Sequence, residues 1–275
     1  MGTYTSMDAN DRHPVVAGRF YPGEASELMA QVRYLLGETL GEERALAAIA
    51  PHAGYVYSGS VAGQVYGRLR VPGTVVVLGP NHTGAGARAS ILSRGNFRVP
   101  GAAIPIDAAF AEELRALALL TDDARAHAQE HSLEVHLPFL LARNPKVRIV
   151  PLCLSAMPYS TCARIGTALA DVINNRGGDV LIVASTDMSH YLPVEEARRL
   201  DGLALDRVLA LDPEGLYATV QEHGISMCGV IPTTIALVAA RALGAAEAEL
   251  VRYAHSGEVS GDLERVVGYA GLLIR

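Results

Sequence analysis

The 275-residue chain has no tryptophan, and aromatic residues make up only 5% of it, although half of its residues are apolar. Its core should therefore consist mainly of alanine, valine and leucine side chains. The chain also lacks any apolar run near the ~20 residues that a membrane-spanning helix needs. The N-terminus, MGTYTSMDANDR, is polar and acidic where a signal peptide would be basic and then apolar. These absences predict a soluble, cytoplasmic protein.

Clustered positive charge and paired cysteines are missing as well. The formal net charge is -6, and the chain contains no block of lysine or arginine, which argues against nucleic acid as a partner. The three cysteines, Cys153, Cys162 and Cys228, are odd in number and include no C-x-x-C pair. This pattern fits a reducing compartment better than a disulfide framework, so any cysteine that matters should act as a thiol or thiolate.

Short apolar segments alternate with segments of helical period, which predicts an α/β fold with a mostly parallel sheet covered on both faces. No repeat or Pro/Ser-rich linker divides the chain, so residues 1–275 are expected to form a single domain. The expected strands are 45–50, 74–79, 147–152, 179–184 and 266–274, and the expected helices are 26–36, 60–69, 108–120, 160–173 and 194–211.

Three of the expected strands are followed closely by histidines. His52 and His82 each follow one strand, and Asp187 and His190 follow a third. One such histidine would more often be a capping or packing residue, but the carboxyl ends of parallel strands meet at one edge of a sheet. Neutral histidines crowded together lose solvation, whereas a divalent ion makes the cluster favourable. The pattern therefore favours a shared metal at this edge.

Cys228 lies just ahead of an apolar helix, where backbone dipoles are expected to lower the pKa of its thiol. A thiolate there could bind the metal, although a buried structural cysteine is an equal alternative. For Cys153 and Cys162, core packing is the favoured interpretation.

The segment HAQEH, residues 127–131, matches the H-x-x-E-H pattern of one class of zinc peptidases. The pattern is short, and His127 lies in a polar stretch where a solvated side chain is the usual explanation. His131 instead opens residues 130–141, which read as an amphipathic helix, and could face the same centre as an acid/base group. His136 is expected to be a packed residue.

Six motifs in order give the chain a resemblance to the MEMO family, the "protein B" component of the AmmeMemoRadiSam system. They are HPVVAGRFYPG, PHAGYVYSG, VLGPNHTG, EHSLEVHLPFL, STDMSHY and the Cys-Gly pair at Cys228. That family is similar in fold to the class III extradiol dioxygenases, so the resemblance implies a three-layer α/β/α sandwich with a non-haem metal centre. Expected partners are a radical-SAM protein and an AMMECR-domain protein.

The resemblance further implies that His52, His82 and Cys228 are the metal ligands. His190 would serve in acid/base chemistry, with Asp187 and His131 lining the same cavity. In the dioxygenases the third ligand is a glutamate, and a softer thiolate in its place lowers the reduction potential. Iron(II) is the favoured metal, copper and zinc stay open, and catechol cleavage is not carried over.

Two functions follow for this cleft. The first is a metal-dependent redox enzyme of unknown substrate. The second is a module that binds a peptide or partner protein and performs no chemistry; peptide binding itself is not transferred from the family, because the segment RFYPG at the start of the cleft contains no tryptophan.

Overall fold

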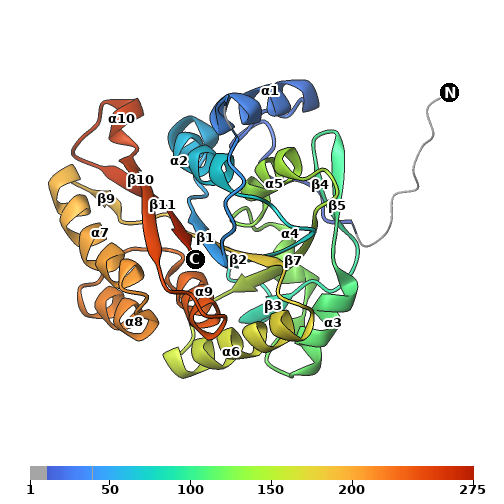
Figure 1. The fold of residues 1–275 in the computed structure, drawn as a ribbon. Coiled ribbons are helices and arrows are strands. Elements are labelled where there is room, and N and C mark those ends of the chain that lie inside the picture. Colours follow the sequence, from blue (N-terminus) through green and yellow to red (C-terminus); the bar gives the residue numbers. More distant parts are fainter. Residues whose placement is uncertain (1–10, 39) are drawn as a thin grey trace.

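The computed structural model describes residues 11–38 and 40–275, which build a nine-stranded sheet with helices on both faces (Figure 1). The strand order is β10-β11-β1-β8-β2-β7-β3-β6, and β9 pairs with β11. The strands are β1 (Ala47–Ala50), β2 (Thr74–Pro80), β3 (Ala89–Ile91), β6 (Thr121–Asp122), β7 (Arg148–Leu154), β8 (Val180–Ser185), β9 (His190–Leu192), β10 (Ala248–His255) and β11 (Val266–Ile274), and β4 (Asn96–Val99) and β5 (Ala102–Pro105) form a separate hairpin.

The middle of the sheet is parallel. β1, β8, β2 and β7 pair in parallel register, whereas β11 joins β1, and β3 joins β7, in antiparallel fashion. Every residue of β1, β2 and β8 is buried, as expected for strands covered on both faces. The parallel centre places the carboxyl ends of β1, β2 and β8 at one edge.

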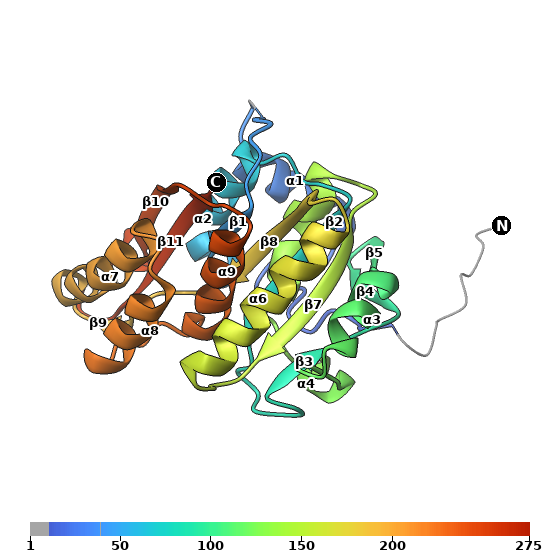
Figure 2. The same ribbon diagram turned by 60° about the horizontal axis from the view of Figure 1, so that its bottom comes forward.

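Helices cover the two faces as separate layers (Figure 2). α1, α2 and α5 pack together on one face, and α6, α9 and α8 cover the other. The helices are α1 (Ala25–Leu36), α2 (Tyr55–Arg68), α3 (Ala108–Ala116), α4 (Ala124–Ala128), α5 (Leu137–Arg143), α6 (Tyr159–Asn175), α7 (Val194–Leu209), α8 (Pro213–Glu222), α9 (Val230–Ala242) and α10 (Gly257–Ser260), with a 3-10 turn η1 (Glu134–His136). The predicted three-layer α/β/α class is confirmed.

A close approach between α1 and α2 depends on glycine. A Cβ atom at Gly63 would lie 2.2 Å from the carbonyl oxygen of Leu35, and one at Gly67 would lie 2.5 Å from that of Leu36. Only glycine therefore allows the end of α1 to pack this tightly on α2.

Two sequence expectations about helices were wrong. Residues 130–141 do not form one helix: a loop leads into η1 and then α5, which has a proline in its first turn. The helix expected over 108–120 ends at Ala116, because Ala118 adopts a positive φ of 55°. Within the described residues, none of the helices combines the length and apolarity that crossing a membrane requires.

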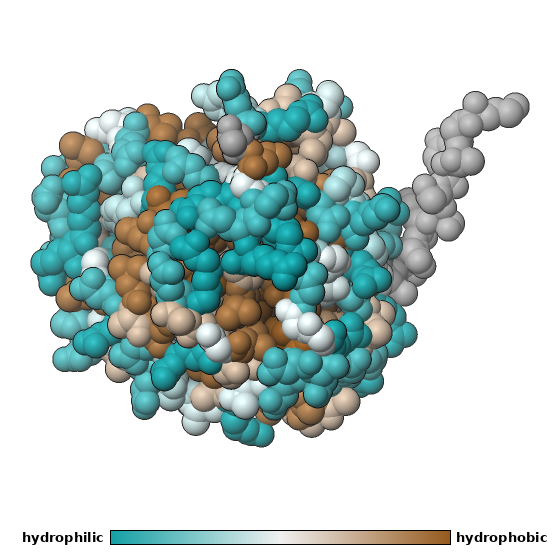
Figure 3. Space-filling model, in the orientation of Figure 1, coloured by the Kyte–Doolittle hydropathy of each residue, from teal (hydrophilic) through white to brown (hydrophobic). Residues whose placement is uncertain are grey.

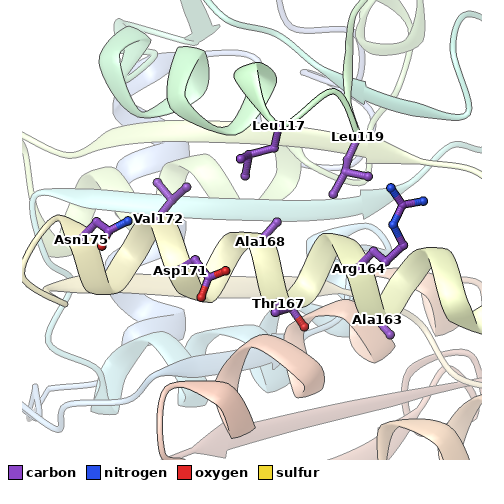
Figure 4. Close-up of a pocket in the computed structure, with 9 residues that line it drawn as sticks. All are labelled: Leu117, Leu119, Ala163, Arg164, Thr167, Ala168, Asp171, Val172 and Asn175. Atoms are coloured by element: carbon purple, nitrogen blue, oxygen red, sulfur yellow. The ribbon is translucent and has the colours of Figure 1, made fainter.

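The face of the molecule seen in Figure 3 is largely hydrophilic, and hydrophobic residues are visible in a hollow just below the centre of the view. An elongated groove of about 530 Å³ lies elsewhere, along α6 and the segment after α3, with Leu117, Leu119 and Arg164 in its lining (Figure 4). None of the histidines singled out in the sequence lines this groove.

Candidate metal centre at the strand ends

The residues expected in the site lie beyond the carboxyl ends of the strands, in loops except for His190, which begins β9. His52 follows β1, His82 follows β2, and Asp187 and His190 follow β8. Cys228 comes just before α9, as the sequence predicted.

Three histidines form a group whose geometry suits a metal ion. His52, His82 and His131 each offer one ring nitrogen, and these nitrogens all lie within 4.8 Å of one another. The rings of His82 and His131 stack with centroids 4.7 Å apart, and that of His52 meets both edge-on. His52 is buried, whereas the side chains of His82 and His131 are 33% and 24% exposed. The group is therefore closed to solvent at His52 and open to solvent at His82 and His131.

Burial favours the neutral form of two of these imidazoles, those of His52 and His131. Burial and the neighbouring His82 and His131 lower the pKa of His52 well below its usual value. Burial likewise lowers the pKa of His131. Neutral imidazole is the form that binds a metal, so the donor set fits a divalent ion.

Glu130 is a buried carboxylate beside two of these histidines, and the sequence analysis did not assign it to the site. It accepts hydrogen bonds from the backbone N–H groups of His82, His131 and Ser132. Burial opposes its ionisation, but these bonds and the one from His82 outweigh that effect and lower its pKa to about 2. The ionised oxygen accepts from His82 Nδ1 at 2.9 Å, so Nε2 is the nitrogen that His82 can offer to a metal. The signal in the sequence that could have indicated this role of Glu130 was an acidic residue next to a histidine in a buried segment.

Cys228 lies against His52 and Asp187. Its Sγ is 3.3 Å from His52 Nε2 and accepts from the backbone N–H of Asp187 at 3.3 Å. Gly229 makes this approach possible, since a Cβ atom there would lie 2.2 Å from the carbonyl oxygen of Ser185. The expected lowering of the Cys228 pKa was wrong for the metal-free chain: burial and the carboxylate of Asp187 raise it. Forming the thiolate therefore needs a cation.

Asp187 is buried under His52, whose backbone N–H donates to it at 2.8 Å. Burial raises the pKa of Asp187 to about 6, and the bond from His52 offsets part of this rise. The carboxyl group therefore helps to set the position of the His52 backbone.

His190 has the hydrogen bonding of a base. Its Nδ1 lies 2.9 Å from the carbonyl oxygen of Ser226, which can only accept, so Nδ1 carries the proton and Nε2 is the basic nitrogen. Its backbone N–H donates to Ser226 Oγ. The next residue, Tyr191, has a positive φ of 60°, which is strained for a tyrosine.

The two histidines of the H-x-x-E-H pattern separate in the structure. α4 ends at Ala128, so His131 lies beyond it. His127 was expected to be solvated, but it is completely buried, with Nε2 3.2 Å from Ser90 Oγ. The neighbouring residues in the sequence are polar and gave no sign of this burial. Residues that are distant in the sequence bury the side chain. His136, Cys153 and Cys162 are buried as predicted.

Glu134 anchors the N-terminal segment over the site, a role the sequence did not indicate. Its buried carboxylate pairs with Arg12, accepts from Tyr21 Oη, and also accepts from the backbone N–H groups of Val15 and Val16. The ring of Phe20, in the same segment, lies 5.0 Å from that of His131. The motif HPVVAGRFYPG thus forms part of the wall of the cluster.

Comparisons with known proteins show which proteins the chain is similar to. Residues 12–273 match the family model described as "Memo-like protein". The chain is 40% identical over 280 residues to a MEMO1 family protein of Methanopyrus kandleri, with 96% of this chain and 99% of that one covered. It is 39% identical over 265 residues to one from Aquifex aeolicus, with 95% and 98% covered.

A crystal structure of an uncharacterised protein of Escherichia coli K12 shares the fold. It has a TM-score of 0.51 and 16% identity, and the match covers 82% of this chain and 99% of that one. This likeness extends to the fold alone and agrees with the α/β architecture expected from the sequence. On its sequence matches, the chain belongs to the Memo-like protein family.

Proposed function

We propose that the chain is a metal-dependent redox enzyme whose non-haem iron is held by His52, His82 and Cys228. The group of three histidine nitrogens within 4.8 Å is the observation that carries this proposal, because His52 and His82 belong to it. Cys228 Sγ, 3.3 Å from His52 Nε2, is close enough to share an ion with that nitrogen. His131 adds a further nitrogen beside them.

The chemistry of the donors supports a redox metal. Two imidazoles and a thiolate form a set that suits iron, copper or zinc, and the thiolate favours the higher oxidation state of a redox ion. Bound there, the metal would supply electron transfer and a position for substrate. Around it, Glu130 orients His82, and Asp187 holds the backbone of His52.

His190 is proposed as the proton-transfer group. The carbonyl oxygen of Ser226 holds the proton on Nδ1, which leaves Nε2 free to take a proton from a substrate and return it later. His131, 24% exposed, is placed to contact substrate on the open side of the cluster.

Metal analysis of protein purified without oxygen tests the proposal. Wild type should carry close to one iron per chain, and His52→Ala and Cys228→Ser should each lose it. Cys162→Ala is the matched control, because Cys162 is a buried thiol in α6 that is not one of the proposed ligands. A metal-free wild type with an intact fold would refute the proposal. Loss of iron in His131→Gln would make His131 a ligand.

A binding module is the second candidate, and an exposed aromatic residue beside the site favours it. The Tyr191 side chain is 65% exposed, its ring lies 5.9 Å from that of His190, and the guanidinium of Arg265 lies over it. Such a surface suits a peptide, or a radical-SAM or AMMECR-domain partner protein. If His52→Ala and Cys228→Ser retain partner binding in pull-downs and support normal cell growth, the module is favoured over the enzyme.

A further inference from the structure

We propose that Ser185, through a buried network with His136 and Tyr66, fixes the proton of His52 on Nδ1 and so presents Nε2 as a preformed metal ligand. This inference rests on the proposed metal function. It assigns Ser185 as a positioning residue, since its hydroxyl contacts His52 at Nδ1 and not at Nε2, the nitrogen that would bind the metal.

Three polar atoms surround the Ser185 hydroxyl at the end of β8. Its Oγ lies 2.7 Å from the carbonyl oxygen of Ser132, 2.7 Å from His52 Nδ1 and 2.7 Å from His136 Nε2. Ser132, Ser185 and His136 are completely buried, and His52 is 2% exposed. In such surroundings each of these contacts must be a hydrogen bond with a defined donor, because an unpaired polar group costs free energy.

The arrangement allows only one assignment of protons. A serine hydroxyl has one hydrogen to donate and two lone pairs. The carbonyl oxygen of Ser132 cannot donate, so the hydroxyl hydrogen must point to it. Both lone pairs of Oγ therefore accept, one from His52 and one from His136. His52 must carry its proton on Nδ1, which leaves the lone pair on Nε2, the nitrogen that faces Cys228.

The far side of His136 is consistent with this assignment. Burial lowers the pKa of His136 to about 3, so the ring is neutral and has one proton. With that proton on Nε2, Nδ1 must accept, and the Tyr66 hydroxyl lies 3.0 Å from it as the donor. Tyr66 is itself completely buried in α2. Each hydrogen bond from Tyr66 to Ser132 therefore has one donor and one acceptor.

The network also reaches the second metal ligand. Ser132 Oγ donates to the carbonyl oxygen of Pro80 at 2.9 Å, two residues before His82. Glu130 holds the proton of His82 on Nδ1 in the same way. One connected set of hydrogen bonds therefore holds a proton on Nδ1 of both imidazoles and leaves Nε2 as the nitrogen available to a metal. A metal then binds without a tautomer change or a rotation of either ring.

Nitrogen NMR of the histidines in metal-free wild type is the direct test. His52 should show a protonated Nδ1 and an unprotonated Nε2, whether or not any variant folds. A proton on Nε2 of His52 would overturn the proposal.

Zinc affinity, measured against a competing chelator, is the second readout. Ser185→Ala should weaken zinc binding by about 10–100-fold, the usual effect of losing a residue that orients a ligand. Ser90→Ala is the matched control: Ser90 is equally buried, donates to a carbonyl oxygen and contacts a buried histidine, His127, outside the group. It should lose similar stability but bind zinc like wild type.

The outcomes separate this inference from the proposed function. Equal zinc affinity of folded Ser185→Ala and wild type, or equal loss in Ser90→Ala, would overturn the positioning role. A wild type that binds neither zinc nor iron would instead contradict the metal function, and the His52 tautomer would still decide the proton arrangement.

Discussion

At the scale of single residues, the buried histidines differ in how their two ring nitrogens are used. His52 has a partner on each ring nitrogen, whereas His127 has Ser90 on Nε2 and no hydrogen-bond partner on Nδ1 within the described part of the chain. Burial, together with the nearby charge of Arg12, lowers the pKa of His127 to about 4. His127 therefore stays neutral in the folded protein at pH values where a solvated histidine is protonated.

This difference predicts a loss of stability in acid. Above pH 6.5, His127 is neutral in both states and contributes nothing to the pH dependence. Between pH 6.5 and about 4 the unfolded chain binds a proton that the folded chain does not, so the free energy of unfolding falls by about 3 kcal/mol as pH decreases. Urea unfolding of wild type and His127→Gln from pH 7 to pH 4 measures this: the variant should show the smaller decrease.

His223→Gln is the control, because His223 is exposed at the end of α8. It should retain the wild-type pH dependence. If His127→Gln did the same, His127 would not be the group that couples protonation to unfolding.

At the scale of secondary-structure elements, local sequence was informative where burial is continuous. The strand expected over 74–79 is Thr74–Pro80 in the structure, because an uninterrupted apolar run fits a strand covered on both faces. The helix expected over residues 130–141 was wrong, although their apolar spacing is helical. The carboxylate of Glu130 accepts hydrogen bonds from the backbone N–H groups of His131 and Ser132. That side-chain contact ends the regular backbone and brings His131 to the cluster, which periodicity cannot reveal.

The end of β2 should be sensitive to a single methyl group. A Cβ atom at Gly79 would lie 2.5 Å from Ser132 Oγ and 3.0 Å from Leu133 Cγ, both in the buried loop before η1. Gly79→Ala should therefore displace that loop and lower the free energy of unfolding by about 1–3 kcal/mol, the usual cost of overpacking. Denaturant unfolding at pH 7 measures the change.

Gly73 provides the comparison just before β2. A Cβ atom there meets nothing within 4 Å, so Gly73→Ala should be neutral or slightly stabilising. Equal stability of the two variants would show that Ser132 and Leu133 can move away at no cost.

At the scale of the whole molecule, the proposed ligands come from segments far apart in the chain. His52 and His82 come together because β1 and β2 end at one edge of the sheet, and Cys228 contacts His52 because the segment before α9 packs against the end of β8 at the same edge. The alternation of strands and helices made this edge predictable from sequence. The entry of His131 into the group was not, because it depends on buried contacts of Glu130 and Ser132 with the end of β2.

A metal bound at this point should stabilise the entire fold, because the unfolded chain does not hold these ligands together. At a free zinc concentration 100 times the Kd, the stabilisation is about 2.7 kcal/mol. For a chain of this size, that corresponds to a rise in Tm of roughly 5–10 °C. Thermal unfolding of apo protein with and without zinc measures it, and a chelator should reverse the rise. His82→Ala, which removes a proposed ligand whose side chain is one-third exposed, should fold but gain much less. An equal rise in wild type and His82→Ala would place the zinc elsewhere on the protein.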